Sequence, residues 1–405
     1  MNHQEMTLDL IGQYYSSINT SKQTGVFALS IYLREPVQVE TLQQATNDLM
    51  QRLPFMNGRL KYGFFNYKYE ILDTFATLQP YDNEPLFGDY YNKESRHMIR
   101  VFYGKTHFTV KTTHSICDGR ALSKFTKALI LRYFELLGLD IKDKAGIIDC
   151  NENPDPEEPE DATKRFMSKC PEGYQKKTTP RKNVYRIKFS KSSPQNILNK
   201  KFKADKMKEA ARTYDATITE YILAHIFYVL AKKRDTAKEK GQIIGTIPID
   251  CRSFFSSKTL RSFVGSIEVT MPEGTDFPQM LEHIKSEFKE ITKYSVHQQL
   301  YEYQKSYHYA RFVPRIIKAL YMKIMTKWEA TEISTGISNL GLIKLPEEIE
   351  SHIDYMEFPI APEQDISNFF SCVTIANTLT LTATFREEGR DFVNEVMSRL
   401  ESFLE

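Results

Sequence analysis

The stretch 111–120, KTTHSICDGR, places a histidine and an aspartate four residues apart. His114 can take up and return a proton near neutral pH, because an unperturbed imidazole has a pKa of about 6.5. Asp118 could orient that imidazole, pair with an arginine, or cap a helix that begins near Gly119. Gly119 would permit a backbone turn that a side chain would block. The spacing alone does not decide between a catalytic pair and an ordinary buried histidine beside a helix cap.

Cys117 lies inside the same stretch and raises the alternative of a thiol nucleophile next to His114. Neighbours in sequence rarely have the geometry for attack, so a small buried thiol is the preferred interpretation. The five cysteines are odd in number and far apart, and none forms a Cys-x-x-Cys pair. This pattern argues against a disulfide framework or a metal site and favours a reducing, cytoplasmic environment.

Apolar residues on either side of the stretch predict the elements that position it. Alternation over 108–112 predicts a strand, and apolar side chains at spacings of three and four over 122–136 predict a helix that Gly138 ends. A second charged strand end follows much later, where the buried strand predicted for 243–249 leads into Asp250 and Arg252. The histidine and the aspartate therefore lie in a loop between a strand and a helix.

Periodicity and turn signals predict the remaining elements. Thr217 and Glu220 form a capping box ahead of a long helix. Other helices are predicted for 40–53, 277–291, 316–328 and 389–404. Other strands are predicted for 26–33, 64–72, 99–103, 184–189, 369–376 and 379–385, the last two forming a hairpin. This mixture predicts an α/β protein with a mixed sheet and flanking helices in each half.

Length and composition predict two subdomains. The 405 residues, 41% of them hydrophobic and 26% charged, suit two cores better than one. Residues 149–183 are rich in proline, acids and lysine, which predicts an exposed linker or crossover. We therefore expect an N-terminal subdomain over 1–150, a linker over 151–183 and a C-terminal subdomain over 184–405.

Charge and hydropathy limit the partners. A net charge of +2 gives no overall field that would favour nucleic acid. The N-terminus has no apolar core of signal-peptide length, and no run approaches the roughly 18 apolar residues of a membrane-spanning helix. Peripheral membrane contact stays open, because the helix predicted for 316–328 carries Lys318, Lys323 and Lys327. Such helices more often pack on their own protein.

Four segments in order resemble one known superfamily. The sequence HSICDG from His114 to Gly119 is similar to the His-x-x-x-Asp-Gly signature of the CoA-dependent acyltransferases. These include chloramphenicol acetyltransferase, the plant BAHD enzymes, alcohol acetyltransferases and the condensation domains of nonribosomal peptide synthetases. Segment 53–60, LPFMNGRL, resembles their Pro-x-Leu-Arg-x-Arg element, and 247–252, IPIDCR, with FVG at 263–265, resembles their Val-Asp-x-Arg … Gly-Asn region. Segment 338–341, SNLG, looks like the Ser-Asn-Leu-Gly of alcohol-acetyltransferase-like members.

The resemblance implies two chloramphenicol-acetyltransferase-like subdomains with an active-site channel between them. His114 is then the general base, Asp118 and Gly119 shape its loop, and Arg252 is the expected partner of Asp118. The enzyme would pass an acyl group from acyl-CoA to a small alcohol or amine without a covalent acyl-enzyme. Acyl-CoA is then a co-substrate, no cofactor is permanently bound, and the chain is expected to be a monomer. Two alternatives are a carrier-protein thioester as donor and a non-catalytic binding relative.

The sequence also departs from the superfamily pattern. Thr113 stands where condensation domains have a first histidine, and the BAHD segment Asp-Phe-Gly-Trp-Gly is absent. The oxyanion donor is consequently open between Ser338 and Asn339, and a turn-forming role for Asn339 is an equal alternative. Candidate contacts for the CoA phosphates are Lys182, Arg186 and Lys188, although a charge run is more often solvated surface. Tyrosines at 301, 303, 307 and 309 fit either a channel lining or a core.

Overall fold

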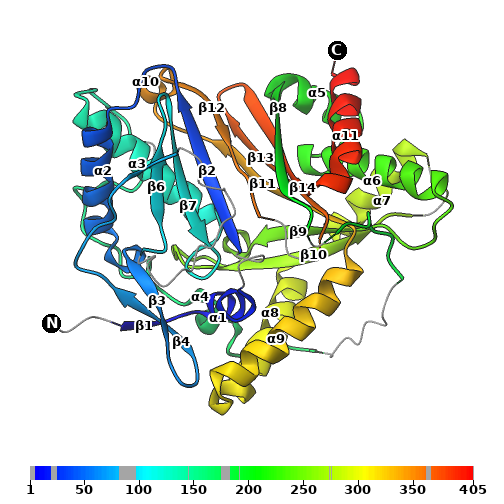
Figure 1. Cartoon of the computed structure of the whole chain (residues 1–405), viewed down its shortest axis with the longest axis horizontal. Coiled ribbons are helices and arrows are strands. Elements are labelled where there is room, and N and C mark those ends of the chain that lie inside the picture. The colour runs from blue at the N-terminus through cyan, green and yellow to red at the C-terminus, as the bar shows by residue number, and fades with distance from the viewer. Residues whose placement is uncertain are drawn as a thin grey trace.

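The computed structural model describes residues 5–19, 25–81, 97–144, 146–174, 183–190, 192–272, 274, 276–361 and 366–404. Within these ranges the strands form three sheets, and helices cover the two larger ones (Figure 1). This is the α/β architecture with mixed sheets that the sequence predicts. In the same ranges, the longest helices carry too many polar and charged residues to cross a lipid bilayer.

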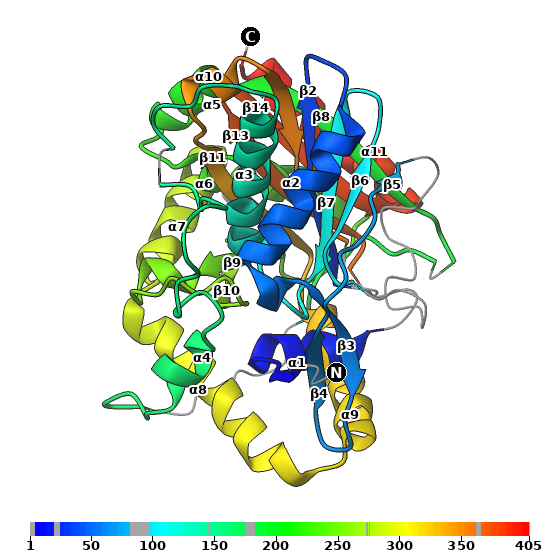
Figure 2. The same cartoon turned by 90° about the vertical axis from the view of Figure 1, so that its left-hand side faces the viewer.

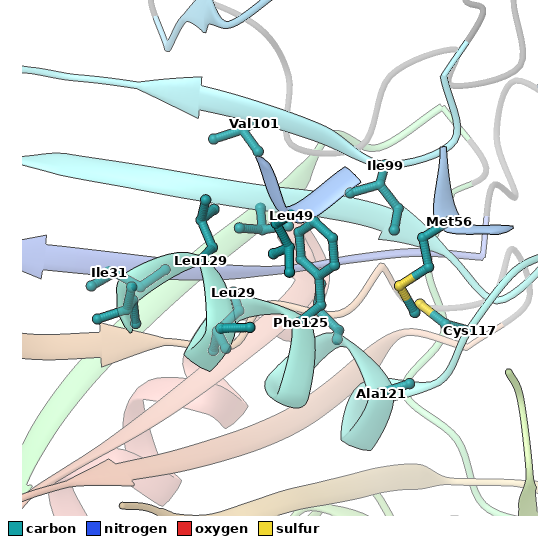
Figure 3. Close-up of a cluster of buried hydrophobic side chains, with 14 of the residues drawn as sticks. Leu29, Ile31, Leu49, Met56, Ile99, Val101, Cys117, Ala121, Phe125 and Leu129 are labelled. Carbon is teal, nitrogen blue, oxygen red and sulfur yellow. The ribbon is translucent and has the colours of Figure 1, made fainter. Parts of the chain in front are cut away.

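The first large sheet carries the histidine. Its order is β12-β2-β7-β6-β5, and all neighbours are antiparallel except the last pair. The strands are β2 (Val26–Leu33), β5 (Gln79–Pro80), β6 (Arg100–Tyr103), β7 (His107–Thr113) and β12 (Ile353–Glu357). Helices α2 (Val39–Arg52) and α3 (Gly119–Leu136) lie side by side across one face (Figure 2). Figure 3 shows Phe125 and Leu129 of α3 packed toward Leu29 and Ile31 of β2, which fixes the helix over the strand.

The second large sheet has the order β10-β9-β11-β13-β14-β8 and carries the arginine. Strand β11 is parallel to both β9 and β13, and the other neighbours are antiparallel. The strands are β8 (Gln195–Lys203), β9 (Ile244–Asp250), β10 (Val264–Thr270), β11 (Thr335–Ile343), β13 (Asn368–Ile375) and β14 (Thr378–Arg386). Helices of this half are α5 (Ala204–Arg212), α6 (Ile218–Thr236), α7 (Phe277–Lys289) and α11 (Arg390–Ser402), whereas the short helix α10 (Glu347–Glu350) packs with the core of the first sheet through Ile349.

A smaller layer lies at one end of the molecule. Strands β1 (Glu5–Thr7), β4 (Tyr67–Ile71) and β3 (Gly58–Tyr62) form a three-stranded sheet in that order. Helices α1 (Leu10–Ile18), α8 (Lys293–Tyr309) and α9 (Arg315–Glu329) pack beside it (Figures 1 and 2). Contacts from α1 to α8 and α9 join segments that lie more than 270 residues apart in the chain.

Several predicted elements are confirmed within a few residues. Strand β2 has the predicted bounds, and Thr217 with Glu220 forms the predicted capping box at the start of α6. The prediction was wrong at 184–189, where Val184 makes only an isolated bridge to Gln242. The strand of this region is β8, whose sequence QNILNKKFK has only three apolar residues and no regular alternation. The strand predicted for 64–72 begins only at Tyr67.

The linker prediction is wrong for the first part of 149–183. The carboxylate of Glu158 receives two hydrogen bonds from Arg52, at 2.8 and 3.0 Å, and both side chains are buried. The carbonyl of Glu158 also accepts the N–H of Leu260 at 2.8 Å. A short helix, α4 (Ala162–Met167), follows and contacts α8. This segment therefore packs against both halves rather than lying exposed.

Candidate active site

His114 lies directly after β7, in the loop that joins this strand to α3. Its ring is stacked on Tyr15 of α1, with centroids 4.6 Å apart, and lies 4.4 Å from the ring of Phe27. Its backbone N–H donates to the carbonyl of Gly25 at 3.0 Å. The side chain is half-buried, and burial lowers the imidazole pKa to about 4, with a smaller opposing effect from the charge of Asp118. His114 is therefore neutral at physiological pH, as a general base must be.

No described residue hydrogen-bonds the buried Nδ1 atom of His114. Asp118 is fully engaged elsewhere, so the two residues do not form a His–Asp dyad. The contacts with Tyr15 and Phe27 and the backbone hydrogen bond to Gly25 position the imidazole ring, and no described carboxylate does so. A buried polar atom without a partner is unusual in a folded protein.

Asp118 both caps α3 and forms the core of a buried ionic cluster. Its Oδ1 accepts the N–H of Ala121 at 2.9 Å, which makes it the N-cap of the helix. Its Oδ2 accepts from Arg252 Nη1 at 2.9 Å and from the N–H of Phe263 at 2.8 Å. Burial alone would raise the pKa of Asp118, but Arg252 and the two N–H donors outweigh burial and lower it. Asp118 is consequently a carboxylate under ordinary conditions.

Arg252 joins the two halves at this point. It follows β9 and is buried, and burial alone would lower its pKa, but Asp118 and Asp250 raise it. Nη1 also donates to Asp250 at 2.9 Å, while Nε and Nη2 donate to the carbonyls of Thr259 and Arg261 at 2.9 and 2.6 Å. This is the contact between Asp118 and Arg252 that the superfamily resemblance implies, across 134 positions of sequence.

The segment 259–263 of the second half binds the motif loop at two places. Ser262 Oγ donates to the carbonyl of His114 at 3.2 Å, and the next residue supplies the Phe263 N–H to Asp118. Arg120 adds a third connection, with its Nε 3.3 Å from Asp250 and its Nη1 donating to the carbonyl of Leu340 at 3.4 Å. The position of the histidine thus depends on both halves.

Gly119 is needed for space rather than for an unusual turn. It is the first residue of α3, and its φ lies outside the positive range that favours glycine. A Cβ atom here would lie 3.1 Å from Phe358 and 3.2 Å from Leu340. The sequence-based reason was therefore wrong, because the constraint is close packing of β11 and residue 358 against the helix start.

Cys117 is buried, and burial raises the pKa of its thiol far above the ordinary value. Its sulfur lies 3.9 Å from the hydroxyl of Thr112. A protonated thiol in this environment is a poor nucleophile. The structure supports the preferred interpretation of Cys117 as a packing residue.

Ser338 and Asn339 lie on β11, close to the start of α3 through their neighbour Leu340. The amide of Asn339 donates to Thr219 at 3.0 Å, and its oxygen accepts the N–H of Gly341 at 2.7 Å. Gly341 has a φ of 74° and lies within the irregularity between Asn339 and Leu342 in the pairing of β11 with β13. These contacts favour the turn-forming alternative for Asn339. The oxyanion role of Ser338 stays a prediction.

The residues predicted to hold CoA phosphates are not gathered near the histidine. Lys182 lies outside the described residues. Lys188 is exposed and pairs with Glu239 at 2.7 Å, and Arg186 donates to the carbonyl of Ala330 at 3.4 Å. Val184, which precedes these two residues, is bridged to Gln242 just before β9 begins. Arg252 follows the other end of β9, and the seven residues of this strand span about 20 Å. Their phosphate-binding role stays a prediction.

A basic cavity of about 220 Å³ lies on the Arg252 side of the site. Lys124 and Lys127 of α3 and Lys258 of the second half line it, together with Glu158. Burial, and then the charges of neighbouring cations, lower the pKa of both Lys124 and Lys127. An anion in this cavity would relieve that repulsion. Sequence analysis missed these lysines because they come from separate segments.

Tyr15 is the other residue at the site that sequence analysis missed. It lies on α1, whose N-cap Asp9 accepts the N–H of Gly12 at 2.7 Å. An aspartate three residues before Gly12 and an apolar run could have indicated this helix. Among the described residues, no cluster of three or more His, Cys, Asp or Glu could hold a metal ion.

Structural comparisons place this geometry in a known fold. A scan of protein-family models finds no match, and a search of curated proteins finds none either. Polyketide synthase associated protein 5 from Mycobacterium tuberculosis superposes with a TM-score of 0.65 at 14% identity, covering 98% of this chain and 97% of that one. The first condensation domain of the calcium-dependent antibiotic synthetase gives a TM-score of 0.65 at 9% identity, covering 99% and 95%.

The epimerization domain from the third module of tyrocidine synthetase B gives a TM-score of 0.58 at 11% identity, covering 99% of this chain and 97% of that one. Each match spans both halves, so the similarity concerns the whole arrangement rather than one sheet. The chain therefore has the condensation-domain fold, the two-subdomain chloramphenicol-acetyltransferase-like fold of the CoA-dependent acyltransferase superfamily.

Proposed function

We propose that this chain transfers an acyl group from a thioester to an alcohol or amine, with His114 as the general base. The observation that carries the proposal is an imidazole at the end of β7 whose neighbouring aspartate is held by Arg252 and not by the histidine. Asp118 then keeps the loop in place and leaves the histidine available to the acceptor. The fold and the His-x-x-x-Asp-Gly sequence support the same reaction class.

In this reaction His114 removes the proton from the acceptor hydroxyl or amine. The acceptor oxygen or nitrogen attacks the thioester carbonyl, and a tetrahedral oxyanion forms. Collapse breaks the carbon–sulfur bond, and the imidazolium returns its proton to the thiolate. The ester or amide and the free thiol leave, and no bond to the protein forms. The charge of Asp118 favours the imidazolium that appears in this step.

The test is release of free thiol from acetyl-CoA with a panel of alcohols and amines. Replacing His114 by alanine should lower kcat/KM by about 10² to 10⁴-fold, the usual contribution of a general base. His225→Ala is the matched control, because this histidine is also buried but lies in the core of the other half. Equal rates for wild type and His114→Ala would contradict the proposed role, as would a loss with both variants alike.

We propose acyl-CoA as the thioester donor, and a carrier-protein thioester is the alternative. Both donors carry a phosphate beside the pantetheine arm, and the cavity lined by Lys124, Lys127 and Lys258 suits an anion. Lys124→Gln should therefore raise KM for the donor with little effect on kcat, while Lys206→Gln on exposed α5 should change neither. Comparing acyl-CoA with acyl-carrier thioesters at equal concentration would separate the donors. Equal KM for Lys124→Gln and wild type would exclude the cavity as the phosphate site.

A further inference from the structure

Helix α9 directs its apolar side away from the protein. Its exposed positions are mostly large apolar residues within one arc of the helix, with exposed fractions between 50% and 72%. These residues are Ile316, Ile317, Leu320, Tyr321, Ile324 and Trp328. The inward side is the more polar one, where Thr326 shares a hydrogen bond with Tyr14 of α1 at 2.9 Å. This orientation is the reverse of an ordinary surface helix.

The exposed apolar surface continues onto the hairpin between β3 and β4. Phe64 and Phe65 lie in its turn, and the ring of Phe65 is 6.4 Å from that of Phe312, at the corner between α8 and α9. Arg315 fixes the two parts together, because its Nε donates to the carbonyl of Gly63 at 3.0 Å. We call the six residues of α9 together with Phe64, Phe65 and Phe312 the apolar ridge. Helix α9 and the hairpin of β3 and β4, which carry these residues, lie at one end of the molecule (Figures 1 and 2).

The chain around the ridge is strongly basic. Segment 303–328 contains six lysine or arginine residues and no aspartate or glutamate, although the whole chain carries only +2. Lys323 and Lys327 are exposed on α9 beside the apolar arc, and no described carboxylate forms an ion pair with either. Lys318 faces inward, where its Nζ donates to Asn66 of the hairpin at 2.6 Å. The positive charge is therefore concentrated at the edge of the apolar surface.

We propose that the apolar ridge binds the surface of a membrane that contains anionic lipids. Exposed isoleucine, leucine, tryptophan and tyrosine with flanking lysines are the composition of helices that lie in the bilayer interface. A second copy is disfavoured, because a two-fold contact between ridges would bring the exposed Lys323 and Lys327 of one copy close to those of the other.

Membrane binding would place the active site close to the lipid. Tyr14 holds α9 through Thr326, and the next residue, Tyr15, is stacked on His114. One helix, α1, thus separates the apolar ridge from the histidine. This proximity implies no role of the ridge in the reaction, and the membrane proposal does not depend on the acyl-transfer proposal.

The test is sedimentation of the full chain with vesicles. We expect it to sediment with phosphatidylcholine vesicles containing about a third phosphatidylglycerol and much less with phosphatidylcholine alone. Trp328 is the only tryptophan, so its emission should shift to shorter wavelength on binding. Ile324→Glu should lower the partition coefficient at least about tenfold. Ile197→Glu, the same change on exposed edge strand β8, should bind as wild type does.

The charge contribution is tested by Lys323→Gln with Lys327→Gln. This pair should lose about fivefold in affinity per lysine for anionic vesicles and nothing for neutral ones. Circular dichroism and melting curves show whether each variant is folded. His114→Ala should bind vesicles normally, which separates this proposal from the catalytic one.

Three results would overturn the proposal. The first is wild-type protein that stays in solution with both kinds of vesicle. The second is Ile324→Glu that binds as tightly as Ile197→Glu. The third is a wild-type dimer that Ile324→Glu dissociates in the absence of vesicle binding, which would assign the ridge to contact between two copies.

Discussion

The proton affinity of His114 sets the conditions under which the proposed reaction can run. Burial among Tyr15 and Phe27 lowers the imidazole pKa to about 4, and the charge of Asp118 only partly offsets burial. A base with a low pKa is present entirely in its neutral form at pH 7, but each proton it takes up is held weakly. Most of the catalytic effect must then come from position and from charge stabilisation in the transition state.

We therefore predict a flat pH–rate profile on the acidic side. Between pH 7 and about pH 5, kcat/KM should change little, since neutral His114 remains the dominant form. Below this range kcat/KM should fall as the imidazole is protonated, with an apparent pKa near 4. The assay is thiol release over a buffer series with the chain shown to stay folded. An acidic limb near pH 6.5 would contradict the effect of burial.

The same depressed pKa affects stability. An unfolded histidine takes up its proton near pH 6.5, before the folded one does, so His114 lowers the free energy of unfolding as pH falls from about 6.5 toward 4. His225, whose pKa burial lowers to about 3, acts in the same direction. Both effects disappear above pH 6.5, where both states are neutral.

Asp118 should matter more for folding than for proton transfer. Asp118→Ala leaves Arg252 buried beside one remaining carboxylate, and breaking a buried pair in this way costs about 3–5 kcal/mol. Denaturant unfolding should show that loss. Arg252→Met combined with Asp118→Ala should cost less than the sum of the two single changes. Glu239→Ala, which breaks an exposed pair with Lys188, is the matched control and should change stability little. Wild-type stability for Asp118→Ala would refute the structural role.

At the scale of elements, α1 controls the histidine through a close backbone contact. A Cβ at Gly12 would lie 2.5 Å from the carbonyl oxygen of Ser115, so Gly12→Ala must push α1 away from the motif loop. The stack of Tyr15 on His114 should loosen, and kcat/KM should fall together with a stability loss of about 1–3 kcal/mol. Gly389→Ala is the control, because its Cβ would lie 3.5 Å from the nearest atom, Cβ of Phe385, and its φ is not positive. Unchanged kcat/KM for Gly12→Ala would show that α1 does not position the base.

Elements with a strong local period could be predicted from the sequence. Strand β7, the loop and α3 follow from apolar spacing, and α6 follows from its capping box. Strand β8 could not, because it is an edge strand rich in asparagine and lysine, and its few apolar residues do not alternate with polar ones. The pairing of β12 with β2 depends on packing across more than 300 residues, and no local period encodes it.

The residues of the candidate site also divide into those that a local sequence pattern reveals and those that only tertiary packing brings together. His114 and its loop are visible in one stretch, whereas the contact of Asp118 with Arg252 was expected only from the superfamily resemblance. Lys124, Lys127 and Lys258 converge because a helix and a loop from separate halves meet, and residue types alone do not predict that meeting. Tyr15 belongs to no motif, and its stack on His114 arises only when α1 packs against the loop after β7.

At the scale of the whole molecule, the two halves are interlocked rather than joined by a single linker. Strand β12, from the predicted C-terminal subdomain, completes the sheet that carries His114. Arg261 of the second half forms a buried ion pair with Asp9, at 3.2 Å, and donates to the carbonyl of Thr7 at 2.8 Å. Each of these contacts would leave a buried charge or an unpaired strand edge if the halves separated.

We therefore predict that residues 1–183 do not fold cooperatively alone. Without β12 the edge of β2 is unpaired, and without Arg261 and Arg252 the carboxylates of Asp9 and Asp118 lose their buried partners. The isolated fragment should aggregate or melt without a sharp transition, as followed by size-exclusion chromatography and circular dichroism. Co-expression with residues 184–405 should restore a soluble complex with one cooperative transition, because every lost contact re-forms between the fragments. A sharp, independent melting transition for 1–183 would show instead that the N-terminal subdomain folds on its own and that its sheet does not need β12.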